Sequence, residues 1–152
     1  MVVVGLDGVG SHTTNMLARA GVGRLRLVDF DNVTVSSLNR NACARRADVG
    51  LPKVEVCRQY FADVLPPPHQ TVETVNRMFT AEAAAELLGG QPDYVVDAID
   101  DTNTKAALIQ YCVDHKLPII ISAGAGACGR RQLAPRNRLT PRCPRGSARL
   151  QG

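Results

Sequence analysis

The sequence lacks any apolar run that approaches the ~20 residues a membrane-spanning helix needs. It also lacks a recognisable secretory signal, because an apolar strand is expected from Met1 onward. Hydrophobic residues make up 45% and charged residues 21% of the chain, which excludes collagen, coiled coil and wholesale disorder. The length of 152 residues and the mass of 16.3 kDa indicate one globular domain, or part of one.

Paired cysteines are absent as well. None of the five cysteines belongs to a C-x-x-C pair, and no histidine lies at a metal-ligand spacing from them. A structural zinc site and a secreted disulfide framework are therefore not expected. Free thiols in a reducing compartment are the simplest interpretation, and they predict a cytoplasmic protein. The cysteines are Cys43, Cys57, Cys112, Cys128 and Cys143.

Acidic residues are missing from residues 129–152, which hold seven arginines. Residues 1–128 hold 11 Lys and Arg against 14 Asp and Glu, so this larger part of the chain is mildly acidic. The calculated pI near 9.0 therefore reflects the tail and does not indicate a basic nucleic-acid-binding domain. The tail has three prolines and no regular apolar period, which predicts disorder. We place a domain over residues 1–127 and a basic tail over residues 128–152.

Apolar strands alternate with helical segments along residues 1–122. Such alternation is typical of βαβ units, in which a parallel sheet is covered on both faces. The fold class predicted is therefore α/β, a Rossmann-like parallel sheet with helices on both faces and a ligand site at the carboxyl ends of the strands. Strands are expected over residues 2–4, 24–29, 70–79, 94–99 and 118–122, and helices over 11–20, 36–40, 52–64, 81–88 and 101–115.

A glycine-rich loop, GLDGVGS over residues 5–11, links the first strand to the first helix. Gly5 permits a tight turn, Gly10 allows close packing of helix and strand, and backbone N–H groups at the helix start can hold a phosphate. Asp7 stands where the second glycine of a G-x-G-x-x-G loop is expected. Its charge is predicted to weaken nucleotide binding, unless Mg²⁺ or a side-chain rotamer directed away relieves the repulsion, and Gly8 partly compensates.

Two carboxylates, Asp29 and Asp31, follow the second strand. An acid at this position can accept hydrogen bonds from ribose hydroxyls, in a nicotinamide enzyme as in an ATP enzyme. Arg40 and Lys53 favour the second class, because two cations neutralise a triphosphate as pyrophosphate leaves. Solvated surface charge is the alternative for both. Asp100, just past the fourth strand, is suited either to Mg²⁺ or to capping the next helix.

These motifs together resemble the ThiF/MoeB/HesA family, the bacterial relatives of ubiquitin-activating enzymes. The resemblance covers residues 1–127. Within that family, LARAGVGRLRLVDFDNVTVSSLNRNACA, PDYVVDAIDDTNTKAALIQYC and ISAGAGA are similar to the tRNA threonylcarbamoyladenosine dehydratases. The matching motifs are GLDGVGS (5–11), DFD (29–31), SSLNR (36–40), DVGLPK (48–53) and DAIDD (97–101).

The resemblance implies a reaction and a set of site residues. ATP would activate the threonylcarbamoyl carboxylate of a modified adenosine in tRNA, and the side chain would then close on itself with loss of water. Members of the family are usually homodimers. The resemblance assigns nucleotide binding to Gly5, Gly8, Gly10, Asp31 (ribose), Asn39, Arg40 and Lys53 (phosphates) and Asp100 (Mg²⁺), with Arg40, Lys53 and Asp100 as catalytic residues.

The chain departs from the family pattern at several places. Asp7 replaces a loop glycine, and Asp101 replaces an asparagine. The sequence begins inside the expected first strand, so the helix that precedes this strand in the family is not expected here. The sequence after residue 127 looks like the product of a frameshift or alternative splicing. Two other interpretations therefore stay open: a non-catalytic or inactive remnant of the same fold, and an NAD-dependent oxidoreductase.

Overall fold

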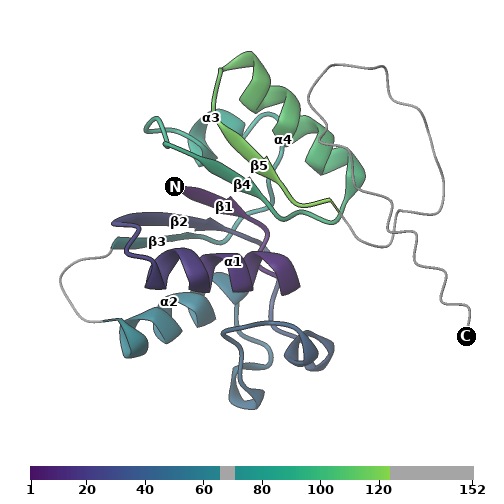
Figure 1. The fold of residues 1–152 in the computed structure, drawn as a ribbon. Helices are drawn as coiled ribbons and strands as arrows, with labels where there is room; N and C mark the ends of the chain where they lie inside the picture. Colours follow the sequence, from purple (N-terminus) through teal and green to yellow (C-terminus); the bar gives the residue numbers. More distant parts are fainter. Residues whose placement is uncertain (66–70, 124–152) are drawn as a thin grey trace, which may run out of the picture.

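A computed structural model describes residues 1–65 and 71–123 (Figure 1). The expected domain boundary after residue 127 and the basic tail, with Cys128 and Cys143, lie outside the described residues. Within them, five parallel strands form one sheet in the order β3-β2-β1-β4-β5. The strands are β1 (Val2–Val4), β2 (Arg24–Val28), β3 (Thr71–Val75), β4 (Val95–Asp97) and β5 (Ile119–Ile121).

Helices cover both faces of this sheet, α1 and α2 on one side and α3 and α4 on the other (Figure 1). The predicted Rossmann-like α/β fold is therefore confirmed. The helices are α1 (Gly8–Arg19), α2 (Lys53–Val64), α3 (Ala84–Leu87) and α4 (Thr102–Asp114), and two 3₁₀ turns, Val35–Asn39 and Arg46–Asp48, lie between β2 and α2.

The apolar strands separate two hydrophobic layers. On one face Val3, Leu25 and Leu27 pack against buried residues of α1 and α2, among them Phe61. On the other face Val2, Val4, Val28 and Val95 pack against buried residues of α3 and α4, among them Leu87 and Leu108. Both side-chain rows of a central strand are thus buried, which explains why β1 consists of valine alone.

The strand order fixes the place of the site. β1 pairs with β2 on one side and with β4 on the other, so that Val4 lies opposite both Val28 and Asp97. The chain leaves these three strands at the same edge of the sheet, and the order of connection reverses at β1. Crevices at such a reversal are where open α/β sheets bind ligands.

Three element boundaries differ by three residues or more from the sequence-based expectation. α1 begins at Gly8 and not at Ser11, because the glycine loop itself turns into the helix. α3 is a single turn of four residues. The third strand ends at Val75 and not at Phe79. Phe79 is buried in the α3 and α4 layer although it lies outside the strand, so its apolar character reflects this packing and not a longer strand.

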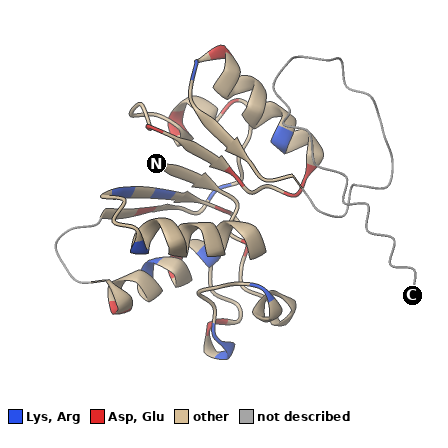
Figure 2. Ribbon diagram, viewed as in Figure 1, with Lys and Arg blue, Asp and Glu red and all other residues tan. Residues whose placement is uncertain are grey.

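Acidic and basic residues occur on both sides of the sheet in the view of Figure 2. The loop between β2 and α2 contains several basic residues, including Arg40, Arg45 and Arg46. In the part of the chain that the structure describes, no helix is both long enough and apolar enough to cross a membrane.

Candidate nucleotide-binding site

Two glycines of the loop after β1 are required by the backbone. Gly5 has a φ of +90°, and a Cβ there would lie 2.6 Å from the carbonyl oxygen of Ala98. A Cβ on Gly10 would overlap the carbonyl oxygen of Gly5, so only glycine lets α1 start this close to the end of β1. The conformational roles predicted for Gly5 and Gly10 therefore agree with the structure.

Asp29 holds this loop in place. Its buried carboxylate accepts a hydrogen bond from the backbone N–H of Leu6 (2.6 Å, at Oδ2) and another from that of Asp31 (2.7 Å, at Oδ1). Burial raises the pKa of the Asp29 carboxyl, although both hydrogen bonds act in the opposite direction. Since Asp29 is buried and both of its oxygens accept backbone N–H groups, the exposed Asp31 is the more accessible acid of this pair for a ribose.

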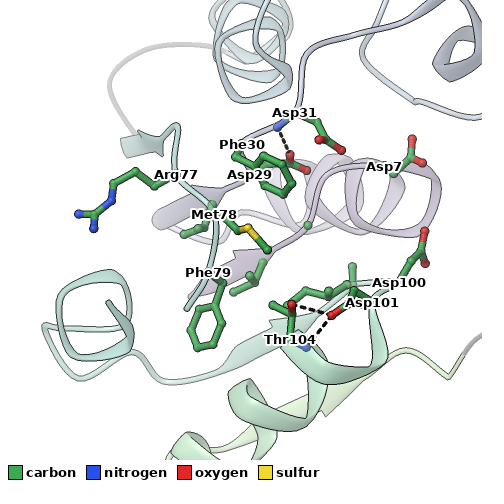
Figure 3. A pocket seen from close by; sticks show the side chains of 15 residues that line it. Asp7, Asp29, Phe30, Asp31, Arg77, Met78, Phe79, Asp100, Asp101 and Thr104 are labelled. Carbon is green, nitrogen blue, oxygen red and sulfur yellow. Dashed lines mark hydrogen bonds between the residues drawn. The ribbon is translucent and has the colours of Figure 1, made fainter. Parts of the chain in front are cut away.

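A cavity of about 230 Å³ opens beside this loop, at the carboxyl ends of β1, β2 and β4 (Figure 3). Phe30, Met78, Phe79 and Ile99 supply an apolar lining, and carboxylates including Asp31 and Asp100 lie around it. An apolar slot with a few polar groups is the usual form of a small-molecule site.

Sequence reasoning missed Phe30 and the segment Arg77–Phe79. The segment was assigned to the third strand, but the strand ends earlier and residues 77–79 line the cavity. Asn76 is the available signal, because asparagine is depleted in strands and favours turns. Phe30 is 54% exposed although it is a large aromatic residue, which no pattern in the sequence indicates.

A second cavity, of about 450 Å³, adjoins the first, since Asp7, Phe30 and Asp31 line both. Its lining contains two of the three predicted phosphate ligands, Arg40 and Lys53. Arg40 donates from Nε (2.8 Å) and Nη2 (2.7 Å) to Oδ2 of Asp7. Lys53 Nζ donates to Asp31 Oδ2 at 3.0 Å and lies 3.8 Å from Asp7 Oδ1.

These ion pairs decide two open questions. Lys53 is buried, which excludes the interpretation of this residue as solvated surface charge. Asp7 does not turn away from the site: its carboxylate faces the cations, and its Oδ1 is buried without a hydrogen-bond partner. The structure thus places Asp7, Arg40 and Lys53 together, with the cations already paired to carboxylates.

Short polar contacts position Arg40 over the loop. Its Nη1 donates to the carbonyl oxygen of Ser36 (2.9 Å) and to Asn39 Oδ1 (3.2 Å). The Asn41 side chain donates to the carbonyl oxygen of Leu6 (2.9 Å), which ties the segment to the glycine loop. Asn41 was missed from the sequence. Asn39 is exposed and lines neither cavity. Its side chain contacts Arg40 and not the space where a phosphate would bind.

The adjacent acids after β4 have different environments. Asp101 caps α4, since its Oδ2 accepts from the backbone N–H and from Oγ1 of Thr104, both at 2.7 Å (Figure 3). The Thr104 N–H bond lowers the pKa of the Asp101 carboxyl. Asparagine caps helices equally well, so Asp101 can replace the family's asparagine in this role. Asp100 lines the smaller cavity and has no hydrogen bond or ion pair within the described residues.

Asp100 is the residue that fits a divalent cation. Mg²⁺ takes oxygen ligands and is commonly held by one or two carboxylates together with waters and substrate phosphates. Among residues 1–65 and 71–123, no group of three or more His, Cys, Asp or Glu is arranged to hold a metal ion. The described donor set therefore fits Mg²⁺ only as an ion shared with a bound phosphate, for which Asp100 could supply one carboxylate.

The sheet order, the glycine loop that leads into α1 and the two adjoining cavities define a Rossmann-like nucleotide-binding domain. Comparison with known protein families specifies which one. The chain belongs to the ThiF family, whose model matches residues 1–146.

Individual relatives are similar over most of the chain. The chain is 43% identical in sequence to tRNA threonylcarbamoyladenosine dehydratase 2 of Saccharomyces cerevisiae, over 84% of this chain and 28% of that protein. Identity to the molybdopterin-synthase adenylyltransferase of Salmonella typhimurium is 40%, over 81% of this chain and 48% of that protein. This chain thus spans about half or less of the length of these relatives.

A solved structure is similar in fold and sequence. The Escherichia coli tRNA N6-threonylcarbamoyladenosine dehydratase in complex with ATP superposes with a TM-score of 0.77 at 40% sequence identity. The match covers 82% of this chain and 50% of that chain. The Rossmann-like fold of the ThiF family is therefore shared.

Proposed function

We propose that this chain is the nucleotide-binding part of an ATP-dependent adenylating enzyme. Its acceptor would be the carboxylate of the threonylcarbamoyl group on a modified adenosine in tRNA. The observation that carries the proposal is the position of Arg40 and Lys53. They come from separate elements, yet both lie at the start of α1 in a cavity that adjoins one of nucleoside size. Similarity to tRNA dehydratases and to an adenylyltransferase supports the same reaction class.

Each part of the site has a task in this proposal. The smaller cavity would take adenine against Phe30 and Met78, and Asp31 would accept hydrogen bonds from the ribose hydroxyls. Gly5, Gly8 and Gly10 would let the phosphates approach the start of α1, where backbone N–H groups point outward. Arg40 and Lys53 would hold the phosphates, with Asn39 supporting Arg40.

The chemistry needs positioning and charge neutralisation. A carboxylate oxygen of the acceptor attacks the α-phosphorus of ATP, and the bond to the β-phosphate bridging oxygen breaks with release of pyrophosphate. The acyl-adenylate that results has AMP as its leaving group, and ring closure expels it. Arg40 and Lys53 would neutralise the charge that builds on the pyrophosphate. Mg²⁺, held in part by Asp100, would supply further neutralisation.

Calorimetry with ATP·Mg²⁺ and with NAD⁺ separates an adenylating from an oxidoreductase site. We expect binding of ATP·Mg²⁺ and none of NAD⁺. Turnover is tested with tRNA that carries threonylcarbamoyladenosine, by AMP release and by the mass of the digested nucleoside, which should fall by one water. NAD⁺ binding without ATP binding would contradict the proposal. The same preparations show by sedimentation whether the chain forms the homodimer that we also propose.

One observation favours a second candidate, a chain that binds nucleoside ligands without adenylating an acceptor. Asp7 pairs with the cations that a triphosphate would need. In this case AMP release would be absent even where ATP·Mg²⁺ binds.

A further inference from the structure

We infer that Asp7 sets the ligand preference of this site, by acting as an internal anion that selects nucleosides with few or no phosphates over triphosphates. The inference rests on the proposed nucleotide site. It concerns which ligand that site prefers, and it is carried by the contacts of Asp7 with Arg40 and Lys53.

The Asp7 carboxylate faces the two cations proposed to bind phosphate, although its side chain accepts no hydrogen bond at the start of α1. It stands at the N-cap of α1, a helix of 12 residues, where the helix dipole favours a negative charge. Two N–H groups of Arg40 donate to one of its oxygens, and Lys53 faces the other. The side chain is 23% exposed, so these charges are only partly screened by water.

The formal charges around the larger cavity cancel. Its described lining holds two carboxylates, Asp7 and Asp31, and two cations, Arg40 and Lys53. A triphosphate entering this cavity meets no net positive field, and it must replace Asp7 as the partner of Arg40. Without Asp7 the same lining would carry one net positive charge.

If Arg40 turned from Asp7 to a ligand, it would lose other contacts as well. It also donates to the carbonyl oxygen of Ser36, and its aliphatic stem passes over Gly8, where an added Cβ would lie 3.5 Å from Arg40 Cδ. A guanidinium group is a rigid planar fork and loses little entropy per hydrogen bond, which favours the paired arrangement with Asp7.

The nucleoside end of the site shares Asp7 and Asp31 with the larger cavity, but not the two cations. The smaller cavity presents Phe30, Met78 and the Asp31 carboxylate, and neither Arg40 nor Lys53 lines it. A base and its ribose can therefore bind while Asp7 and Arg40 remain paired. The favoured ligand class is a nucleoside, or a nucleotide whose phosphates remain outside the larger cavity.

The test compares adenosine and ATP·Mg²⁺ by calorimetry, at one salt concentration, on the 152-residue chain and on Asp7→Gly and Asp7→Asn. The unsubstituted chain should bind ATP·Mg²⁺ no more tightly than adenosine. In Asp7→Gly the affinity for ATP·Mg²⁺ should rise about tenfold, a factor typical of one charge-assisted hydrogen bond, and that for adenosine should stay within about twofold.

Asp7→Asn separates charge from bulk. It keeps the size of the side chain and an oxygen for Arg40, so it should show most of the gain if charge decides. Asp114→Asn, an equal charge change at the end of α4, should leave both affinities unchanged. Adenosine binding also reports that each variant is folded, which matters because Asp7 precedes α1.

The outcomes distinguish this inference from the proposed function. If adenosine and ATP·Mg²⁺ bind and Asp7→Gly leaves the ATP affinity unchanged, the inference is wrong and the nucleotide site stands. If neither ligand binds to any variant, both are wrong. If Asp7→Gly gains affinity but Asp7→Asn does not, bulk at this position and not charge determines the preference, and the inference is overturned.

Discussion

Lys53 is bound to Asp31 through both its backbone and its side chain. Its amide N–H donates to the Asp31 carbonyl oxygen at 2.9 Å, and its ammonium donates to the Asp31 carboxylate at 3.0 Å. The start of α2 is thereby fixed to the segment that follows β2. The ammonium lies at the larger cavity, and 5% of the side chain is exposed.

We expect Lys53→Met to weaken ATP·Mg²⁺ binding about tenfold or more, because a charge that faces the phosphates is removed while the stem is kept. The free energy of unfolding should fall by about 1–2 kcal/mol, through loss of the hydrogen bond to Asp31. Calorimetry and urea unfolding measure the two effects. Lys116→Met, the same change on an exposed residue after α4, should alter neither, and equal losses in both variants would contradict a role of Lys53 in the site.

Arg40 and Asp7 should be coupled in ATP binding. In the Asp7→Gly background, Arg40→Ala should abolish most of the gain in ATP·Mg²⁺ affinity, because the guanidinium freed from Asp7 is the group that binds phosphate. A double-mutant cycle measured by calorimetry gives the coupling. Arg58→Ala, which removes a similarly exposed arginine paired to Glu55, is the matched control and should have no effect. Additive effects of Asp7→Gly and Arg40→Ala would argue against this prediction.

Gly10→Ala should destabilise the fold. The added methyl group overlaps the Gly5 carbonyl oxygen, so the loop and the start of α1 have to separate. We expect a loss of roughly 1–3 kcal/mol in the free energy of unfolding, as for other overpacked positions. Gly23→Ala is the matched control, since a Cβ there meets no atom within 4 Å and the backbone is not in the left-handed region. Urea unfolding of the two variants measures this loss. Equal free energies of unfolding would show that the loop accommodates the methyl group without destabilising the fold.

The pH dependence of stability should reveal the buried carboxyl of Asp29. Burial raises its pKa above the ordinary 3.8, so the folded chain retains a proton that the unfolded chain has already released. As pH rises between 3.8 and the raised value, the contribution of Asp29 to stability therefore falls.

Asp29→Asn cannot titrate and removes this effect. The free energy of unfolding of the unsubstituted chain minus that of Asp29→Asn should decrease with rising pH over that interval and become constant above it. Urea unfolding at a series of pH values measures the difference. A difference that increases with pH would mean that the bonds from Leu6 and Asp31 outweigh burial and lower the pKa of Asp29.

The sequence predicts the fold well because the fold depends on local patterns. The apolar run Val2–Val4 and the glycines at 5 and 10 identify β1, its turn and the packing of α1 without knowledge of distant residues. Phe79 misled the assignment of β3, since its apolar character serves the layer under α3 and α4 and not the strand.

The site was only partly predictable, because its contacts join distant segments. The choice between Asp29 and Asp31 depends on which one receives the Leu6 N–H, 23 residues away from Asp29. The pairing of Asp7 with Arg40 spans 33 residues. A spacing pattern shows that these side chains approach the same edge of the sheet, but it does not show which charges are already satisfied.

The Asp7 ion pairs also bear on the resting state of the protein. Two cations facing one empty cavity repel each other, and a ligand that neutralises them ordinarily makes the protein harder to melt. In this chain the Asp7 carboxylate already neutralises part of that positive charge, so much of the repulsion between the cations is removed before a ligand binds. Anionic ligands should therefore raise the melting temperature of the unsubstituted chain only slightly. Variants that lack the Asp7 carboxylate should have a lower melting temperature without ligand, and a larger increase when an anionic ligand binds.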